Sequence, residues 1–259
     1  MRTSNPALNE NIFSRTGLAD GQVMTIQGAV NKTLVLLALV LVSAGWIWGK
    51  IIQPTQVLGY SAPELARQNQ SAVLPFIIGG GIIGFIFALI TIFKKEWSMV
   101  TAPVYAVAEG LVLGGISAFF EMRYPGIVMQ AVGLTFGTLF CLLMAYKSGL
   151  IRVTDKFRLG VVAATGAIAL FYFVTFILGF FNMTVPFVNG GGIFGIGFSL
   201  FVVGIAALNL VLDFDMIERG ADAGAPKYME WYCAFGLMVT LIWLYMEMLR
   251  LLAKLRGRD

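Results

Sequence analysis

The sequence predicts an all-α membrane protein, a bundle of seven transmembrane helices with the seventh helix at its centre. Hydrophobic residues make up 58% of the 259 positions and charged residues only 12%, whereas soluble proteins average about 45–50% apolar and about 25% charged residues. The mean hydropathy is +0.83. Seven apolar runs are each long enough to cross a bilayer, which takes about 20 residues of helix. With so few charged residues, the chain lacks the polar surface that a water-soluble protein of this size needs.

Each predicted helix is an apolar run with polar or turn-forming residues at both ends. The runs lie at residues 33–52, 72–93, 102–121, 126–146, 157–181, 192–216 and 231–253. A connection with two prolines follows the first run, a Lys-Lys-Glu triplet the second and an Arg-Tyr-Pro triplet the third. A basic loop, a glycine-rich loop and a charged loop separate the remaining runs, and such residues mark the ends of membrane helices.

The chain therefore divides into a cytoplasmic N-terminal tail at 1–32, a transmembrane domain at 33–253 and a basic C-terminal tail at 254–259. The helix at 231–253 is expected to be central because it has no polar face before Glu247, and a helix that is apolar all round is enclosed. Its apolar positions are Ala234, Phe235, Leu237, Met238, Leu241, Ile242 and Leu244.

Basic residues indicate the orientation in the membrane. Most of them fall in the N-terminal tail and in the connections after the second, fourth and sixth runs: Arg2, Arg15, Lys32, Lys94, Lys95, Lys147, Arg152, Lys156, Arg219 and Lys227. The positive-inside rule places these segments, and the N-terminus, in the cytoplasm. Seven crossings would put the basic tail outside. Either the last helix does not cross fully, or this tail is an exception to the rule.

The composition also excludes several kinds of function. Histidine is absent, which removes His-based zinc sites and the Ser-His and Cys-His catalytic pairs. The Gly-x-Gly-Asp motif of intramembrane aspartyl proteases is missing as well, so we expect no enzymatic activity. The net charge of +4 forms no continuous basic patch, and membrane orientation explains it better than nucleic-acid binding does.

Four carboxylates lie within the apolar runs: Glu109, Asp213, Asp215 and Glu247. A charged side chain at the bilayer centre costs about 2.5–3.5 kcal/mol even on lenient insertion scales, so each is a candidate site residue. Glu109 lies about 10 Å into its helix and is either functional or a structural carboxyl bonded to a neighbouring helix. Glu247 is either functional or neutralised by Arg250, three residues later on the same helix.

Asp213 and Asp215 are about 200° apart around a helix, so we expect only one of them to face the bundle interior. Asn209 lies one turn before Asp213 on the same stripe, which favours Asp213 as the inward carboxylate. The alternative is that both aspartates simply end the helix at the headgroups, beside Glu218 and Arg219.

Several motifs resemble the Bax inhibitor-1 family. Residues 212–218, LDFDMIE, followed by Trp-Tyr-Cys at 231–233, are similar to the Asp-x-x-x-Ile signature that closes the sixth helix in that family. Gly110, Leu113 and Gly114 fit its Gly-x-x-Leu-Gly pattern, and the opening MRTSNPALN resembles a bacterial branch, the YccA-like proteins. The order of these motifs along seven helices extends the resemblance over most of the chain.

The resemblance implies a central seventh helix and a pH-sensitive calcium leak governed by two aspartates, one in the sixth helix and one in the seventh. Asp213 matches the first. The second is expected near Val239 or Thr240, neither of which ionises. Glu247, seven residues beyond Thr240 on nearly the same face, and Glu109 are therefore the candidate partners of Asp213.

We thus expect a multi-pass protein of the bacterial inner membrane, in contact with the lipid bilayer, that acts as a pH-sensitive calcium or cation leak. Asp213 would bind Ca²⁺ transiently, with no other cofactor, and desolvation would favour its protonated form. The alternative is a non-transporting regulator, since YccA-like proteins suggest binding to a membrane-anchored quality-control protease through the N-terminal tail. The oligomeric state is left open.

Overall fold

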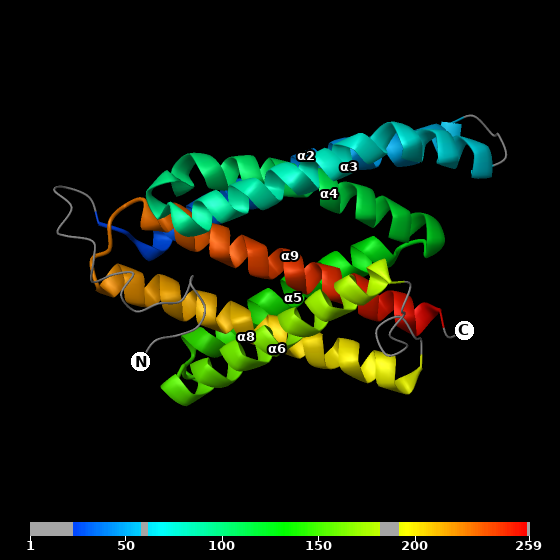
Figure 1. Cartoon of the computed structure of the whole chain (residues 1–259). Coiled ribbons are helices and arrows are strands. Elements are labelled where there is room, and N and C mark those ends of the chain that lie inside the picture. Colours follow the sequence, from blue (N-terminus) through cyan, green and yellow to red (C-terminus); the bar gives the residue numbers. More distant parts are fainter. Residues whose placement is uncertain (1–22, 58–61, 182–191, 258–259) are drawn as a thin grey trace. The chain divides into compact units, whose positions relative to one another are not determined.

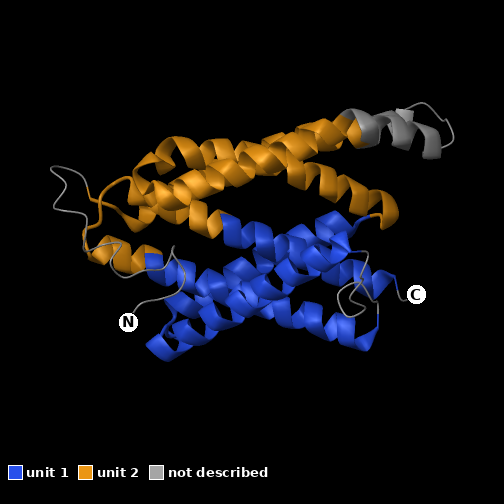
Figure 2. Ribbon diagram, in the orientation of Figure 1, with its two compact units in different colours: residues 1–5, 126–216, 239–259 blue, residues 6–125, 217–238 orange. Residues whose placement is uncertain are grey.

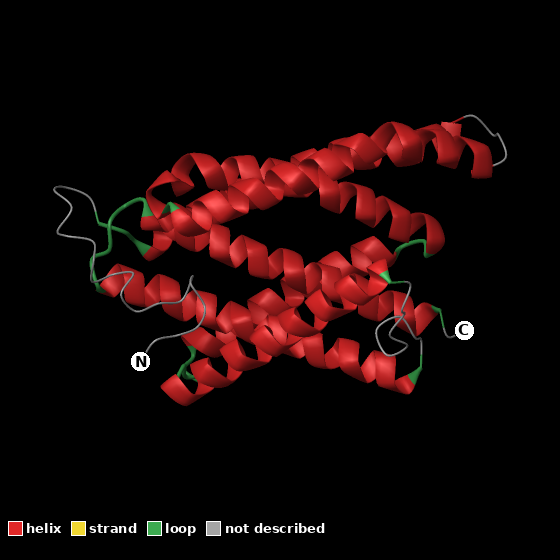
Figure 3. Ribbon diagram, in the orientation of Figure 1, coloured by secondary structure: helices red, strands yellow, loops and turns green. Residues whose placement is uncertain are grey.

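The computed structural model describes residues 23–57, 62–181 and 192–257. This part of the chain is built from long helices (Figures 1 and 3). They are α2 (Ile26–Val57), α3 (Ala62–Phe93), α4 (Ser98–Arg123), α5 (Ile127–Lys147), α6 (Asp155–Phe180), α8 (Ile193–Asp222) and α9 (Met229–Arg256), with a short 3-10 helix, η1 (Lys95–Trp97), before α4. The described residues contain seven helices long and apolar enough to cross a membrane. The all-α, seven-helix prediction is confirmed.

Several helices extend beyond the apolar runs that predicted them. α2 begins at Ile26 rather than at residue 33, and α9 continues to Arg256 rather than to 253. The helices therefore continue into the segments predicted as tails at 1–32 and 254–259, and the division of the chain itself stays a prediction. The expected connection at 53–71 is largely helical as well. Hydropathy marks only the part of a helix that lies in hydrocarbon, whereas backbone hydrogen bonds continue through polar turns outside it.

The chain forms two compact units, which are described separately (Figure 2). The described parts of 6–125 and 217–238 form unit 2, and those of 126–216 and 239–259 form unit 1. α8 and α9 thus contribute residues to both units. The seven apolar positions that predicted a central last helix are all buried, but the central position itself stays a prediction.

In unit 2, α4 packs closely on α2 through glycine. A Cβ on Gly110 would overlap the Ser43 hydroxyl, and one on Gly114 would overlap the Ala44 carbonyl oxygen. The two glycines are four positions apart on one face of α4, the spacing that lets membrane helices approach backbone to backbone. Larger side chains at these positions would separate the two helices.

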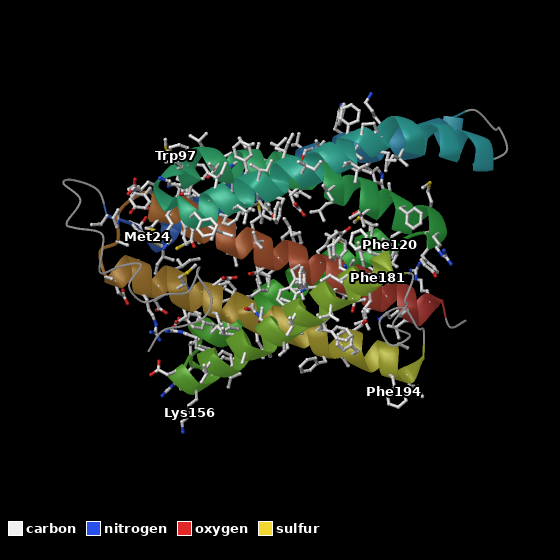
Figure 4. All side chains as sticks on the ribbon, viewed as in Figure 1. Met24, Trp97, Phe120, Lys156, Phe181 and Phe194 are labelled. Carbon is white, nitrogen blue, oxygen red and sulfur yellow. The ribbon has the colours of Figure 1, made fainter. Side chains whose placement is uncertain are left out.

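The start of α9 is bonded to other segments of unit 2. The Met24 amide, just before α2, donates to the Ala225 carbonyl over 2.7 Å, and the Ser98 hydroxyl at the start of α4 donates to the Tyr228 carbonyl over 3.1 Å. Met24 is buried at this end of the unit, whereas Trp97 is exposed at the end of η1 (Figure 4). Several contacts therefore fix where α9 begins.

In unit 1, the end of α9 contacts α8 and α5. The Lys254 amine donates to the Ser199 hydroxyl over 2.8 Å and to the Gly195 carbonyl over 3.1 Å, and Arg256 donates to Gln130 over 2.9 Å. α9 has 28 residues without a break, about 42 Å at 1.5 Å per residue. With its basic end, α9 is therefore long enough to cross a membrane in full. The side on which that end lies stays a prediction.

Candidate functional site

Asp213 is buried in α8, with 8% of its surface exposed. Its carboxyl is hydrogen-bonded to the Thr240 side chain of α9. The other oxygen, Oδ2, has no hydrogen-bond partner within the part of the chain that the structure describes. Burying a carboxylate oxygen without a partner is costly. Asp213 is therefore buried with only part of its hydrogen-bonding capacity used.

Thr240 occupies one of the two positions at which the resemblance places a second acid. Its hydroxyl donates one hydrogen bond and carries no charge. The Asp213–Thr240 pair therefore holds at most one negative charge. In the pair of aspartates that the resemblance implies, the two carboxyls would instead share one proton or repel each other.

Asp215 corrects the expectation that only one of the two aspartates faces inward, because it is buried to the same 8% as Asp213. Val211, Leu212 and Phe214 are buried too, so this turn of α8 is enclosed on all sides and the argument from a single inner face does not hold. Asp215 forms an ion pair of 2.7 Å with Arg158 in the first turn of α6. Asp215 is thus a buried, neutralised carboxylate.

Asn209, expected beside Asp213, directs its amide to α6. It donates to the Thr165 hydroxyl over 2.8 Å and to the carbonyl of Ile205, one turn earlier on its own helix, also over 2.8 Å. The residue therefore links α8 to α6, on the same stripe of α8 as Asp213.

Glu247 is fully buried at 0% exposure, and of its two alternatives the structure contains the pairing with Arg250, at 2.6 Å. The Tyr172 hydroxyl of α6 also contacts both carboxylate oxygens, at 3.1 and 3.2 Å. The Arg250 guanidinium lies 5.3 Å from the centre of the Tyr172 ring. Glu247 is therefore neutralised by its own partners, and it is Thr240 that contacts Asp213.

Glu109 lies in unit 2, on the side of α4 that meets α3. Its Oε2 is 3.4 Å from the position a Cβ on Gly84 would take, and Tyr105 stands one turn earlier on the same helix. Glu109 and Asp213 belong to different units, so the hypothesis that they pair stays a prediction.

Sequence reasoning missed a fourth buried carboxylate, Glu230, at the start of α9. It is 0% exposed and pairs with Lys32 of α2 and, at 3.0 Å, with Lys227. The amide and hydroxyl of Thr25 donate to the same carboxylate at 2.9 and 3.0 Å. Glu230 stands one residue before the predicted run at 231–253 and is therefore not among the carboxylates within the apolar runs. The Lys227–Glu230 spacing of three residues was the available signal.

These carboxylates do not gather into a metal centre. Among residues 23–57, 62–181 and 192–257, no group of three or more His, Cys, Asp or Glu side chains is placed to hold a metal ion. The described chemistry consists of separate carboxylates, of which Asp215, Glu230 and Glu247 have basic partners.

The fold and this arrangement define a multi-pass helical membrane protein with a partly satisfied carboxyl buried in one of its spans. A profile of the Bax inhibitor 1 like family matches residues 5–257, nearly the whole length. The chain belongs to this family, which confirms the resemblance seen in its motifs. No curated protein and no solved structure matches the chain. Membership of the YccA-like branch stays a prediction.

Proposed function

We propose that the protein is a pH-sensitive cation leak, with calcium as the permeant ion, controlled by the protonation of Asp213. The observation that carries this proposal is a carboxyl buried in a membrane-spanning helix with one oxygen unpartnered among the described residues. An ionisable residue within a membrane span is a functional candidate by default. The activity implied by the family resemblance supports the same choice.

The two protonation states of Asp213 would have opposite effects on a cation. The ionised carboxylate attracts a cation and supplies the oxygen ligands that Ca²⁺ prefers. The protonated carboxyl is neutral and leaves the apolar surroundings as a barrier to charge. Because acidification removes the negative charge, we expect flux to fall as the pH falls.

The pairing of the other buried carboxylates of unit 1 supports the choice of Asp213 as the controlling group. On α8 and α6, Asp215 is paired with Arg158, and on α9, Glu247 is paired with Arg250. Each pair is close to neutral as a whole, whereas Asp213 contacts the uncharged Thr240. Ionisation of Asp213 therefore adds a charge that a passing cation relieves.

Calcium entry into liposomes tests this proposal. The purified full chain is reconstituted into vesicles loaded with a calcium indicator, and empty vesicles of the same lipid give the baseline. We expect calcium entry above the baseline at neutral pH and slower entry at acidic pH. Entry equal to the baseline at every pH would contradict the proposal and favour the non-transporting regulator that binds a membrane protease.

A further inference from the structure

Three polar side chains of α6 are spaced seven residues apart, at Arg158, Thr165 and Tyr172. Seven residues are nearly two full turns, so the three lie along one stripe of the helix with a drift of about 20° per step. The stripe extends about 21 Å at 1.5 Å per residue, a large part of the roughly 30 Å hydrocarbon thickness. Two buried apolar residues, Val161 and Ile168, alternate with them on this side of α6.

Each residue of the stripe makes a polar contact with a different partner on α8 or α9. These contacts are Arg158 with Asp215 at 2.7 Å, Thr165 with Asn209 at 2.8 Å and Tyr172 with Glu247 at 3.1 Å. By contrast, Lys156 is exposed and projects outward from the first turn of α6 (Figure 4). The stripe is therefore the polar side of α6 that faces the other helices of unit 1.

The partners also connect this stripe to the Asp213 site. On α8, Asn209 bonds to α6, and Asp213, one turn later, contacts Thr240 of α9. On α9, Glu247 accepts from α6 and lies seven residues beyond Thr240 on nearly the same face. Polar side chains of α6, α8 and α9 thus meet one another pairwise along unit 1.

We propose that this seam, defined by the Arg158–Thr165–Tyr172 stripe and its partners on α8 and α9, is the route that the cation follows. The inference rests on the proposed leak and names its path. Hydroxyl, amide and carboxylate oxygens along the seam replace part of the hydration shell of the ion. The ion pairs Asp215–Arg158 and Glu247–Arg250 lie toward its two ends, and Asp213 lies between them.

Polar contacts between membrane helices also serve simply to hold the helices together. A second hydroxyl on the same helix controls for the loss of a local bond. Thr175 of α6 donates to the carbonyl of Phe171 at 2.8 Å, as Thr165 does to the carbonyl of Val161, but within the described residues only Thr165 also accepts from Asn209 of α8. Thr165→Val and Thr175→Val therefore remove the same local bond, and only Thr165→Val removes a contact of the seam.

The first measurement is calcium flux at neutral pH. Thr165→Val should slow calcium entry about fivefold relative to wild type, as expected for the loss of one neutral ligand in a barrier. Thr175→Val should conduct as wild type does, and Thr165→Ser, which keeps the hydroxyl, should restore most of the flux. Equal flux in Thr165→Val and Thr175→Val would overturn the inference.

The second measurement is water access, which remains informative if Thr165→Val folds poorly. Thr165→Cys and Leu170→Cys are made in a protein with Cys141→Ala and Cys233→Ala, and each is treated with a charged, water-soluble thiol reagent. Leu170 is exposed and lies about 140° round α6 from Thr165. We expect modification at position 165, with loss of flux, and none at 170. An unmodified Thr165→Cys in a conducting protein overturns the route and leaves the proposed leak intact. A wild type without flux overturns both.

Discussion

The Glu230 carboxylate lies in the space that a Cβ on Gly28 would occupy. Lys32, Lys227 and Thr25 hold this carboxylate from several directions, and it has no exposed surface. It is therefore unable to withdraw without losing charged partners. Glycine at position 28 is what allows the start of α9 to bond to α2 through a buried carboxylate.

Gly28→Ala should destabilise the protein by about 1–3 kcal/mol, the usual cost of adding a methyl group to a filled site. Gly45→Ala, on the same helix, is the matched control because nothing lies within 4 Å of its added Cβ. The measurement is the unfolding midpoint of both variants in detergent. Equal midpoints would show that the Glu230 carboxylate does not fill the site beside Gly28.

The Arg158–Asp215 pair predicts a larger loss when one partner is removed. Asp215→Asn removes the carboxylate charge that lies against the Arg158 guanidinium, which is only 13% exposed, and breaking a buried pair in this way costs about 3 kcal/mol. Replacing both residues together, by Arg158→Met with Asp215→Leu, removes the uncompensated charge and should restore most of the stability. The unfolding midpoints of the three proteins measure this. A double variant as unstable as Asp215→Asn would argue against the ion pair.

Membrane topology can be tested at exposed ends of the helices. In a protein with Cys141→Ala and Cys233→Ala, we expect Lys94→Cys and Leu150→Cys to be labelled from the cytoplasmic side. Arg123→Cys should be labelled from the opposite side, because one helix separates it from each of the others. All three positions are exposed. Labelling of all three from the same side would refute the orientation.

The number and order of the helices were predictable because a membrane span requires a long apolar run. Their ends were not, since the turns before residue 33 in α2 and after residue 253 in α9 are polar and hydropathy does not register them. Glu230 was missed for the same reason, as it stands just outside its predicted run. Its role depends on a contact with Lys32, almost two hundred positions earlier, that no local pattern contains.

The candidate site was predictable only in part. Asp213 stood out because a carboxylate within an apolar run is costly, and Glu247 was correctly paired with Arg250 because their spacing is local. Asp215 was misjudged because its side of α8 is also covered, and the residue that neutralises it, Arg158, comes from another helix. The hydrogen bond between Asp213 and Thr240 likewise depends on how two helices meet, which composition and periodicity do not define.

The central claim is that the protonation of Asp213 controls cation flux, and the pH profile of Asp213→Asn tests it most directly. Asparagine keeps the shape of the side chain but is always neutral, so flux should be low and nearly independent of pH. Asp222→Asn is the matched control, since Asp222 is an exposed aspartate on the same helix, and its profile should follow wild type. The measurement is calcium entry into liposomes from neutral to acidic pH. A wild-type profile in a folded Asp213→Asn protein would contradict the account.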